Sequence, residues 1–63
     1  MEFKIGNMIR TFDGDFEIID IKETIDRVTN KPCLGITVKS NNYNGTRYYF
    51  EREIICTYAK GQE

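Results

Sequence analysis

Residues Gly6 to Ile21 read GNMIRTFDGDFEIIDI, and the rest of the chain is interpreted as built around them. The stretch indicates two strands joined by a turn. Asp13-Gly14 is the predicted tip of that turn, because these residue types tolerate the positive φ angles of a tight hairpin. The chain is therefore predicted to open with a β-hairpin.

The position of the tip sets the register of this hairpin. With Asp13 and Gly14 at the tip, Arg10 lies opposite Glu17, as a cross-strand ion pair. Because side chains alternate between the two faces of a strand, one face becomes core and the other mostly solvent-exposed. The predicted core face carries Ile9, Thr11, Phe16 and Ile18.

The alternation breaks after Ile18, where two apolar residues are adjacent and Asp20 follows. A β-bulge or a sharp bend near Ile19 and Asp20 would let one long strand serve two walls of a small barrel. That strand is predicted to continue to about Ile25 and to be followed by a polar loop.

A turn at Asn30-Lys31-Pro32 is predicted to lead into the clearest strand of the chain, because Pro fixes φ and pushes the preceding residue out of the helical region. In that strand Leu34, Ile36 and Val38 alternate with small or polar residues. Gly35 would let another backbone or a bulky ring lie close above it.

The next hairpin is predicted to have an odd-numbered loop ending at Gly45, which would set Val38 opposite Phe50 or Tyr48. Tyr48 and Phe50 would then be core, and Arg47 and Tyr49 would face outward. A single 3₁₀ turn is predicted for residues 51–53 and a closing strand for residues 54–58.

Length and composition restrict the classes of function. The 63 residues are expected to form one domain, 1–63, with a small core, and the net charge of −1 disfavours binding to a phosphate backbone. No stretch has the length of a membrane span or the pattern of a signal peptide, so a cytoplasmic location without membrane contact is expected.

The sequence offers few residues for catalysis, because it contains no histidine and no Gly-rich phosphate loop. The protein is predicted not to be an enzyme and to need no cofactor or metal. Cys33 and Cys56 cannot supply a four-ligand zinc site alone and are expected to be reduced and partly buried, with a disulfide as the alternative. The acidic run Asp13, Asp15 and Glu17 is interpreted as surface rather than as a calcium loop.

The predicted order of elements resembles the SH3-like barrels, a group that includes KOW and Tudor domains. The residues Gly6 to Gly14 are similar to the opening of a KOW repeat, although Glu17 stands where such a repeat has a second glycine. The resemblance implies a five-stranded all-β SH3-like barrel whose loops bind partners. Likeness to KOW implies contact with RNA or the ribosome.

The function predicted is that of a small binding module acting through protein–protein contact. Its size suggests an accessory protein of a phage or mobile element that modulates a larger host complex. Exposed Tyr and Arg side chains and the first turn are the candidate contacts, because such residues dominate interface energetics. These candidates are Tyr43, Arg47, Tyr49, Asp13 and Asp15.

Two alternatives remain open. A KOW-like domain would bind nucleic acid through basic residues, with affinity that falls steeply with salt. A structural subunit would instead self-associate through an exposed edge strand. The basic candidates are Lys31, Lys39, Arg47 and Arg52.

Overall fold

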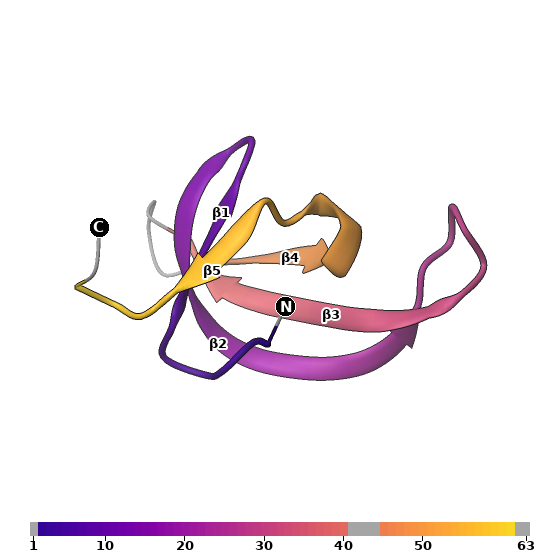
Figure 1. Cartoon of the computed structure of the whole chain (residues 1–63), viewed down its shortest axis with the longest axis horizontal. Coiled ribbons are helices and arrows are strands. Elements are labelled where there is room, and N and C mark those ends of the chain that lie inside the picture. The colour runs from indigo at the N-terminus through magenta and orange to yellow at the C-terminus, as the bar shows by residue number, and fades with distance from the viewer. Residues whose placement is uncertain (1, 41–44, 62–63) are drawn as a thin grey trace.

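The computed structural model describes residues 2–40 and 45–61, which form one antiparallel β-sheet and one turn of 3₁₀ helix (Figure 1). The prediction of an all-β fold with a 3₁₀ turn before the last strand is confirmed. The elements are β1 (Met8–Thr11), β2 (Gly14–Ile25), β3 (Pro32–Lys39), β4 (Thr46–Phe50), η1 (Glu51–Glu53) and β5 (Cys56–Tyr58).

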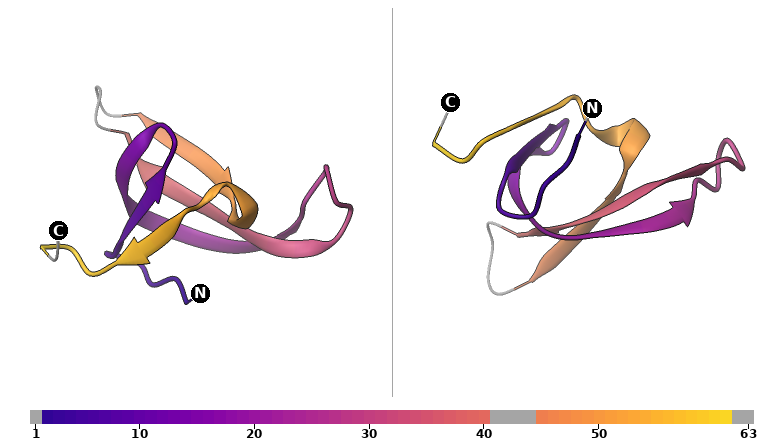
Figure 2. Two further views of the ribbon diagram at one scale, coloured as in Figure 1. Left: turned by 45° about the horizontal axis from the view of Figure 1, so that its top comes forward. Right: turned by 60° about the horizontal axis from the view of Figure 1, so that its bottom comes forward.

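The five strands lie in the order β4-β3-β2-β1-β5, so β4 and β5 form the two edges. The long strand β2 curves strongly, and its hairpin with β3 projects away from the other strands (Figures 1 and 2). A closed barrel requires the two edges to pair. Within the described ranges no ladder joins β4 to β5, so the sheet is open and the predicted closure into a barrel is not confirmed.

The tip of the first hairpin differs from the prediction by one residue. Thr11 pairs with Gly14, which places Phe12 and Asp13 at the tip, and Arg10 pairs with Asp15 rather than with Glu17. The buried Thr11 hydroxyl accepts a bond from the Asp13 backbone N–H at 3.0 Å and donates to the Gly14 carbonyl at 3.0 Å. Gly14 takes φ +123°, which glycine adopts readily.

This change of register leaves the two faces of the hairpin unaltered. Moving the tip by one residue shifts the partner of each residue by two positions. Because side chains on one face of a strand recur every two residues, each residue keeps its face. The predicted core face is therefore confirmed, with every member less than 10% exposed: Ile9, Thr11, Phe16 and Ile18.

The predicted bulge in β2 is also confirmed. Ile18 pairs with Val38 and Asp20 pairs with Thr37, so Ile19 is the extra residue and is 41% exposed. After the bulge, Ile21 returns to the core side, where it pairs with Ile36. The bulge thus keeps both halves of a bent strand packed on the same core.

The alternation predicted for β3 is confirmed, because Ile36 and Val38 are fully buried and Leu34 packs against the core. Of the two close approaches predicted over Gly35, the structure has the bulky ring, and it is the ring of Tyr48. A Cβ atom at Gly35 would overlap the Tyr48 hydroxyl.

The register of the β3–β4 hairpin is where the sequence prediction is wrong. Val38 pairs with Arg47 and Ile36 with Tyr49, and six residues, an even number, separate Lys39 from its partner Thr46. Residues 41–44 lie outside the described part of the chain. Tyr49 is therefore only 7% exposed, whereas Tyr48 is 46% exposed, the reverse of the prediction.

The core is completed from both ends of the chain. Phe3, in the segment before β1, is buried, and this segment bonds to β2 through Gly6 N–H and the Ile18 carbonyl. Ile54, which follows η1 in the sequence, is also buried. Strand β5 begins at Cys56, so the closing strand is shorter than the predicted 54–58. Each such side chain contributes roughly 1.5–3 kcal/mol when fully buried. The core consists of Phe3, Ile9, Phe16, Ile18, Ile36, Val38, Tyr49 and Ile54.

Candidate functional site

Three of the predicted contact residues come together at the tip of the first hairpin. The Tyr49 hydroxyl donates to Asp13 Oδ2 at 3.0 Å, and Arg47 Nη1 lies 3.4 Å from the same oxygen. Arg47 Nη1 also donates to the Tyr49 hydroxyl at 3.2 Å. Asp13, Arg47 and Tyr49 thus form one connected group, called the tip group, which joins β4 to the β1–β2 turn.

Two aromatic rings pack against this group. The rings of Phe16 and Tyr49 stack with centroids 5.8 Å apart, and the Arg47 guanidinium lies 5.5 Å from the centre of the Phe16 ring. The hydrogen bond to Tyr49, together with the charge of Asp13, raises the pKa of Arg47 above its usual value. Tyr49 is buried rather than facing outward as predicted, and its hydroxyl accepts a hydrogen bond that positions the Arg47 guanidinium.

The most exposed aromatic residue of this region was missed by the sequence analysis. Phe12 is 93% exposed at the hairpin tip, beside Asp13. The predicted tip placed Phe12 inside a strand, opposite Asp15, and Phe12 was therefore not among the predicted contact residues. The signal that could have revealed it is Thr11, because Thr and Ser hydroxyls often bond the backbone of a following turn.

Asp15, the remaining described contact candidate, lies on the other face of the hairpin. Arg10 donates to both Asp15 carboxylate oxygens, at 3.1 and 3.0 Å, and the Tyr58 hydroxyl donates to Oδ2. The Arg10 guanidinium also stacks 5.5 Å from the Tyr58 ring centre. Hydrogen bonds from Arg10 and then Tyr58 hold the pKa of Asp15 below its usual value, so this group joins β1, β2 and β5 as a charged pair. Tyr43 lies outside the described residues.

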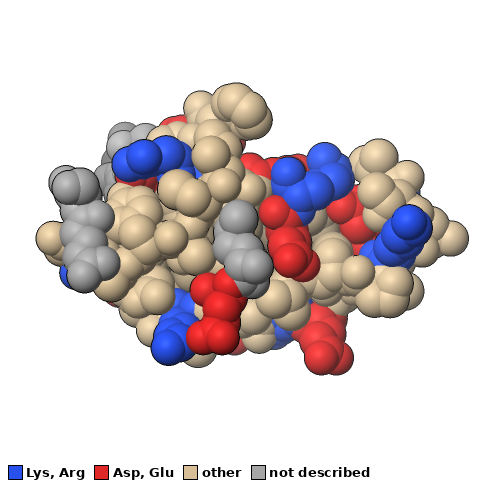
Figure 3. Space-filling view, in the orientation of Figure 1, with Lys and Arg blue, Asp and Glu red and all other residues tan. Residues whose placement is uncertain are grey.

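The four basic residues predicted for nucleic-acid binding are not brought together. Lys31 precedes β3 and Lys39 ends it, so they are roughly 25 Å apart along the strand. Arg52 forms an ion pair with Asp26 at 2.7 Å, and Arg47 belongs to the tip group. On the face shown in Figure 3, basic and acidic side chains lie side by side.

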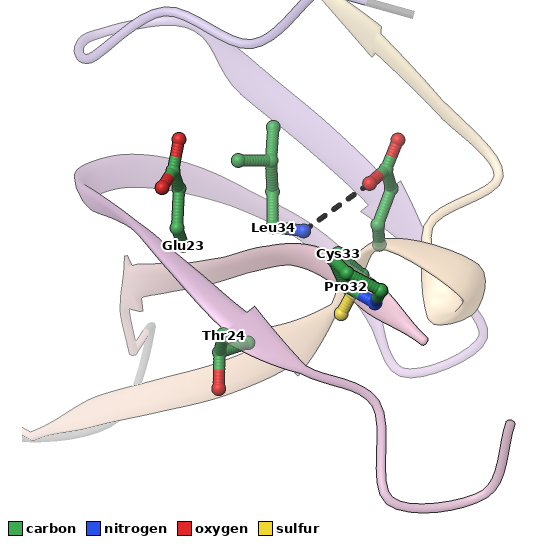
Figure 4. Close-up of a pocket in the computed structure, with 6 residues that line it drawn as sticks. Glu23, Thr24, Pro32, Cys33 and Leu34 are labelled. Carbon is green, nitrogen blue, oxygen red and sulfur yellow. Dashed lines mark hydrogen bonds between the residues drawn. The ribbon is translucent and has the colours of Figure 1, made fainter. Parts of the chain in front are cut away.

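A shallow open hollow of about 330 Å³ lies where η1 meets the β2–β3 hairpin. In Figure 4 the Glu23 and Leu34 side chains project to one side of the ladder and Thr24 to the other. Glu51 accepts a bond from the Leu34 backbone N–H at 3.2 Å, so its carboxylate holds η1 against β3. Cys33 also lines the hollow, and both Cys33 and Cys56 are free and half-buried, as predicted.

A second open groove, of about 360 Å³, lies on the outer face of the sheet. Tyr48 and Phe50 of β4 form one wall, packed edge to face at 5.5 Å between centroids. The sequence analysis missed this groove because it assigned both rings to the core. The rest of the lining comes from Thr24, Ile25 and Arg27.

In the described part of the chain, no group of His, Cys, Asp or Glu side chains is arranged to hold a metal ion, and no helix has the length and apolar character needed to cross a bilayer. Comparisons with protein-family models, with curated proteins and with solved structures each gave no match. The fold and the site define a small all-β domain with an exposed aromatic tip.

Proposed function

We propose that this chain is a binding module that acts through protein–protein contact, and that its contact surface is the tip surface, defined as Phe12, Asp13 and Arg47. The observation that carries the proposal is the 93% exposure of Phe12 on a turn clamped by Thr11. Because the turn is fixed and the ring is already exposed, Phe12 can insert into an apolar pocket on a partner with little loss of conformational entropy.

The chemistry of the surroundings supports this choice. Aromatic residues and Arg are enriched among the few residues that dominate binding energy, and a polar rim excludes water from them. Asp13 and Arg47 provide such a rim, because they are about half exposed and are already paired with each other. The expected partner surface is a hydrophobic pocket bordered by polar groups.

The proposed module is non-enzymatic and cytoplasmic and modulates a larger host complex, as an accessory protein of a phage or mobile element would. The chemistry of the site supports its non-enzymatic character. The polar side chains of the tip group bond to one another, and the sequence offers no histidine as a general base. Such a surface suits recognition better than catalysis.

The test is capture of partners from a host lysate by immobilised wild-type protein and by Phe12→Ala. Loss of a central aromatic contact should weaken capture by roughly 30-fold or more, while the melting temperature stays unchanged because the ring is exposed. Val28→Ala is the matched control, because Val28 is 73% exposed on the distant β2–β3 loop. Equal capture by Phe12→Ala and wild type would refute the proposal.

The alternative of a KOW-like nucleic-acid-binding domain has less support, because Lys31, Lys39, Arg47 and Arg52 do not share one surface. Salt titration of binding to a labelled single-stranded RNA distinguishes the two. Phosphate contacts would make affinity fall steeply as salt rises, and Lys39→Ala would reduce that slope. Absence of binding at low salt would exclude the alternative.

A further inference from the structure

Strand β4 offers an open edge with a defined set of hydrogen-bonding groups. Ser40 N–H donates to the Gly45 carbonyl, and the Phe50 N–H is directed to Glu53 Oε2 rather than to β3. Bonded and non-bonded pairs alternate along an antiparallel ladder. Both observations therefore indicate that Gly45, Arg47 and Tyr49 bond through their backbone groups to β3 and the adjoining Ser40, and that the residues between them do not. The backbone groups of Thr46, Tyr48 and Phe50 therefore point away from β3.

We propose that this edge pairs with β4 of a second copy of the chain, antiparallel, about a two-fold axis at Tyr48. The Tyr48 N–H of each copy donates to the Tyr48 carbonyl of the other. The Thr46 N–H of each copy donates to the Phe50 carbonyl of the other. The ladder ends there, because Glu53 already accepts the Phe50 N–H.

The side chains of β4 are self-complementary in this register. On the outer face, Tyr48 lies beside Tyr48 of the second copy and diagonal to its Phe50. The existing edge-to-face pair would become a cluster of aromatic rings, and aromatic cross-strand pairs each contribute favourably. The exposed 46% of Tyr48 would be covered.

Charge favours the same arrangement. Arg47 is the only charged residue of β4, and it lies opposite Tyr49 of the second copy rather than opposite another Arg47. Lys39 of β3 pairs with Thr46 at the beginning of β4, whereas η1, which follows the end of β4, carries two acidic residues and one basic residue. Antiparallel pairing brings the acidic end of one copy to the basic end of the other.

The edge has few of the devices that keep edge strands apart. Natural edges are blunted by charged side chains, especially Lys, and by Pro, a bulge or very short length. The one charged side chain of β4, Arg47, is paired with Asp13. Strand β4 contains five residues without Lys or Pro and pairs with β3 in unbroken register, whereas the opposite edge, β5, has only three residues. The inference does not rest on the proposed function, because it uses the backbone edge of β4 and the outer-face ring of Tyr48, neither of which belongs to the tip surface.

In the proposed dimer, residue 48 of one copy lies opposite residue 48 of the other, so a charge placed there meets an identical charge. Sedimentation equilibrium should show wild-type dimers that dissociate on dilution from roughly 1 mM, in the range expected for a small interface. Tyr48→Lys and Tyr48→Glu should each be monomeric, because like charges oppose, and an equimolar mixture of the two should recover dimers. Val28→Lys, with the same added charge far from β4, should dimerise like wild type.

Circular dichroism is the control that tests whether each variant folds. Should either substitution unfold the chain, synthetic protein N-methylated at the Tyr48 backbone removes the outward N–H while keeping the side chain, and it should be monomeric. A wild type that stays monomeric at roughly 1 mM, a dimer that persists in Tyr48→Lys or in the N-methylated protein, or a monomeric Lys and Glu mixture would overturn the proposal.

Discussion

The carboxylate of Asp26 is buried and forms an ion pair with Arg52 at 2.7 Å, which ties the β2–β3 loop to η1. Asp26 Oδ1 also accepts backbone bonds from Val28 at 2.8 Å and Thr29 at 3.4 Å. Burial acts to raise the pKa of Asp26. The two backbone donors and the guanidinium outweigh burial, so the pKa of Asp26 is held below its usual value.

Removing the guanidinium should therefore destabilise the fold. Arg52→Ala leaves a buried carboxylate with only its backbone donors, and the melting temperature should fall by roughly 5–10 °C. Differential scanning calorimetry measures the change. Arg27→Ala is the matched control, because Arg27 belongs to the same loop and should change little. Equal effects of the two substitutions would show that the ion pair does not hold the loop.

Stability should fall in acid. The pKa values of Asp15, Glu17 and Asp26 are all held below their usual values, and Lys60 does this for Glu17 through its hydrogen bond. At pH values between the folded and unfolded pKa, the unfolded chain binds more protons, so stability rises with pH there. The stabilisation is complete above the ordinary values of 3.8 and 4.5 and is lost as pH falls through the lowered ones.

The measurement is the melting temperature between neutral pH and about pH 2.5, the range in which carboxylates protonate. Asp15→Asn should flatten part of this dependence because it removes one titrating carboxylate. A dependence that is the same in Asp15→Asn as in wild type would mean that the Arg10–Asp15 pair contributes nothing to folding.

The hydroxyl of Tyr49 should stabilise the fold measurably. Tyr49→Phe keeps the buried ring but removes the bonds to Asp13 and Arg47, at a cost of about 1 kcal/mol in unfolding free energy by urea titration. Tyr48→Phe, on a ring that is 46% exposed, should be nearly neutral. The opposite order would mean that Tyr48 is the core tyrosine, as the sequence analysis predicted.

A side chain at position 35 should displace the Tyr48 ring. Gly35→Ala introduces a Cβ atom where the Tyr48 hydroxyl lies, so the half-exposed ring must move, at a cost of about 1 kcal/mol of unfolding free energy. In a Tyr48→Ala background the same substitution should be neutral or slightly stabilising, because glycine weakens a strand interior. Additive effects in this double-mutant cycle would contradict the close approach.

The first hairpin shows how much strand patterning settles without a structure. Its tip was predicted one residue too late, yet every residue assigned to the core face is buried, because an error of two in pairing preserves the face. The bulge at Ile19 was also evident from two adjacent apolar residues that a regular strand cannot place on one face. Side-chain alternation carried this information locally.

The second hairpin shows where patterning fails. Tyr48, Tyr49 and Phe50 are three consecutive aromatic residues, and either alternation buries a ring. The structure buries Tyr49 because Phe16 offers a stacking partner and Asp13 accepts its hydroxyl, while Gly35 leaves room for Tyr48 on the outside. These partners lie on β2, the first turn and β3, far from β4 in sequence.

The sequence by itself determined the five strands, the 3₁₀ turn and the core faces of β1, β2 and β3, because alternation and turn chemistry act between neighbouring residues. Only the tertiary structure decided that the sheet stays open, which tyrosine is buried, and that Phe12 stands exposed beside the Asp13–Arg47 pair. Each of these depends on contacts between strands distant in the chain, which no local pattern encodes.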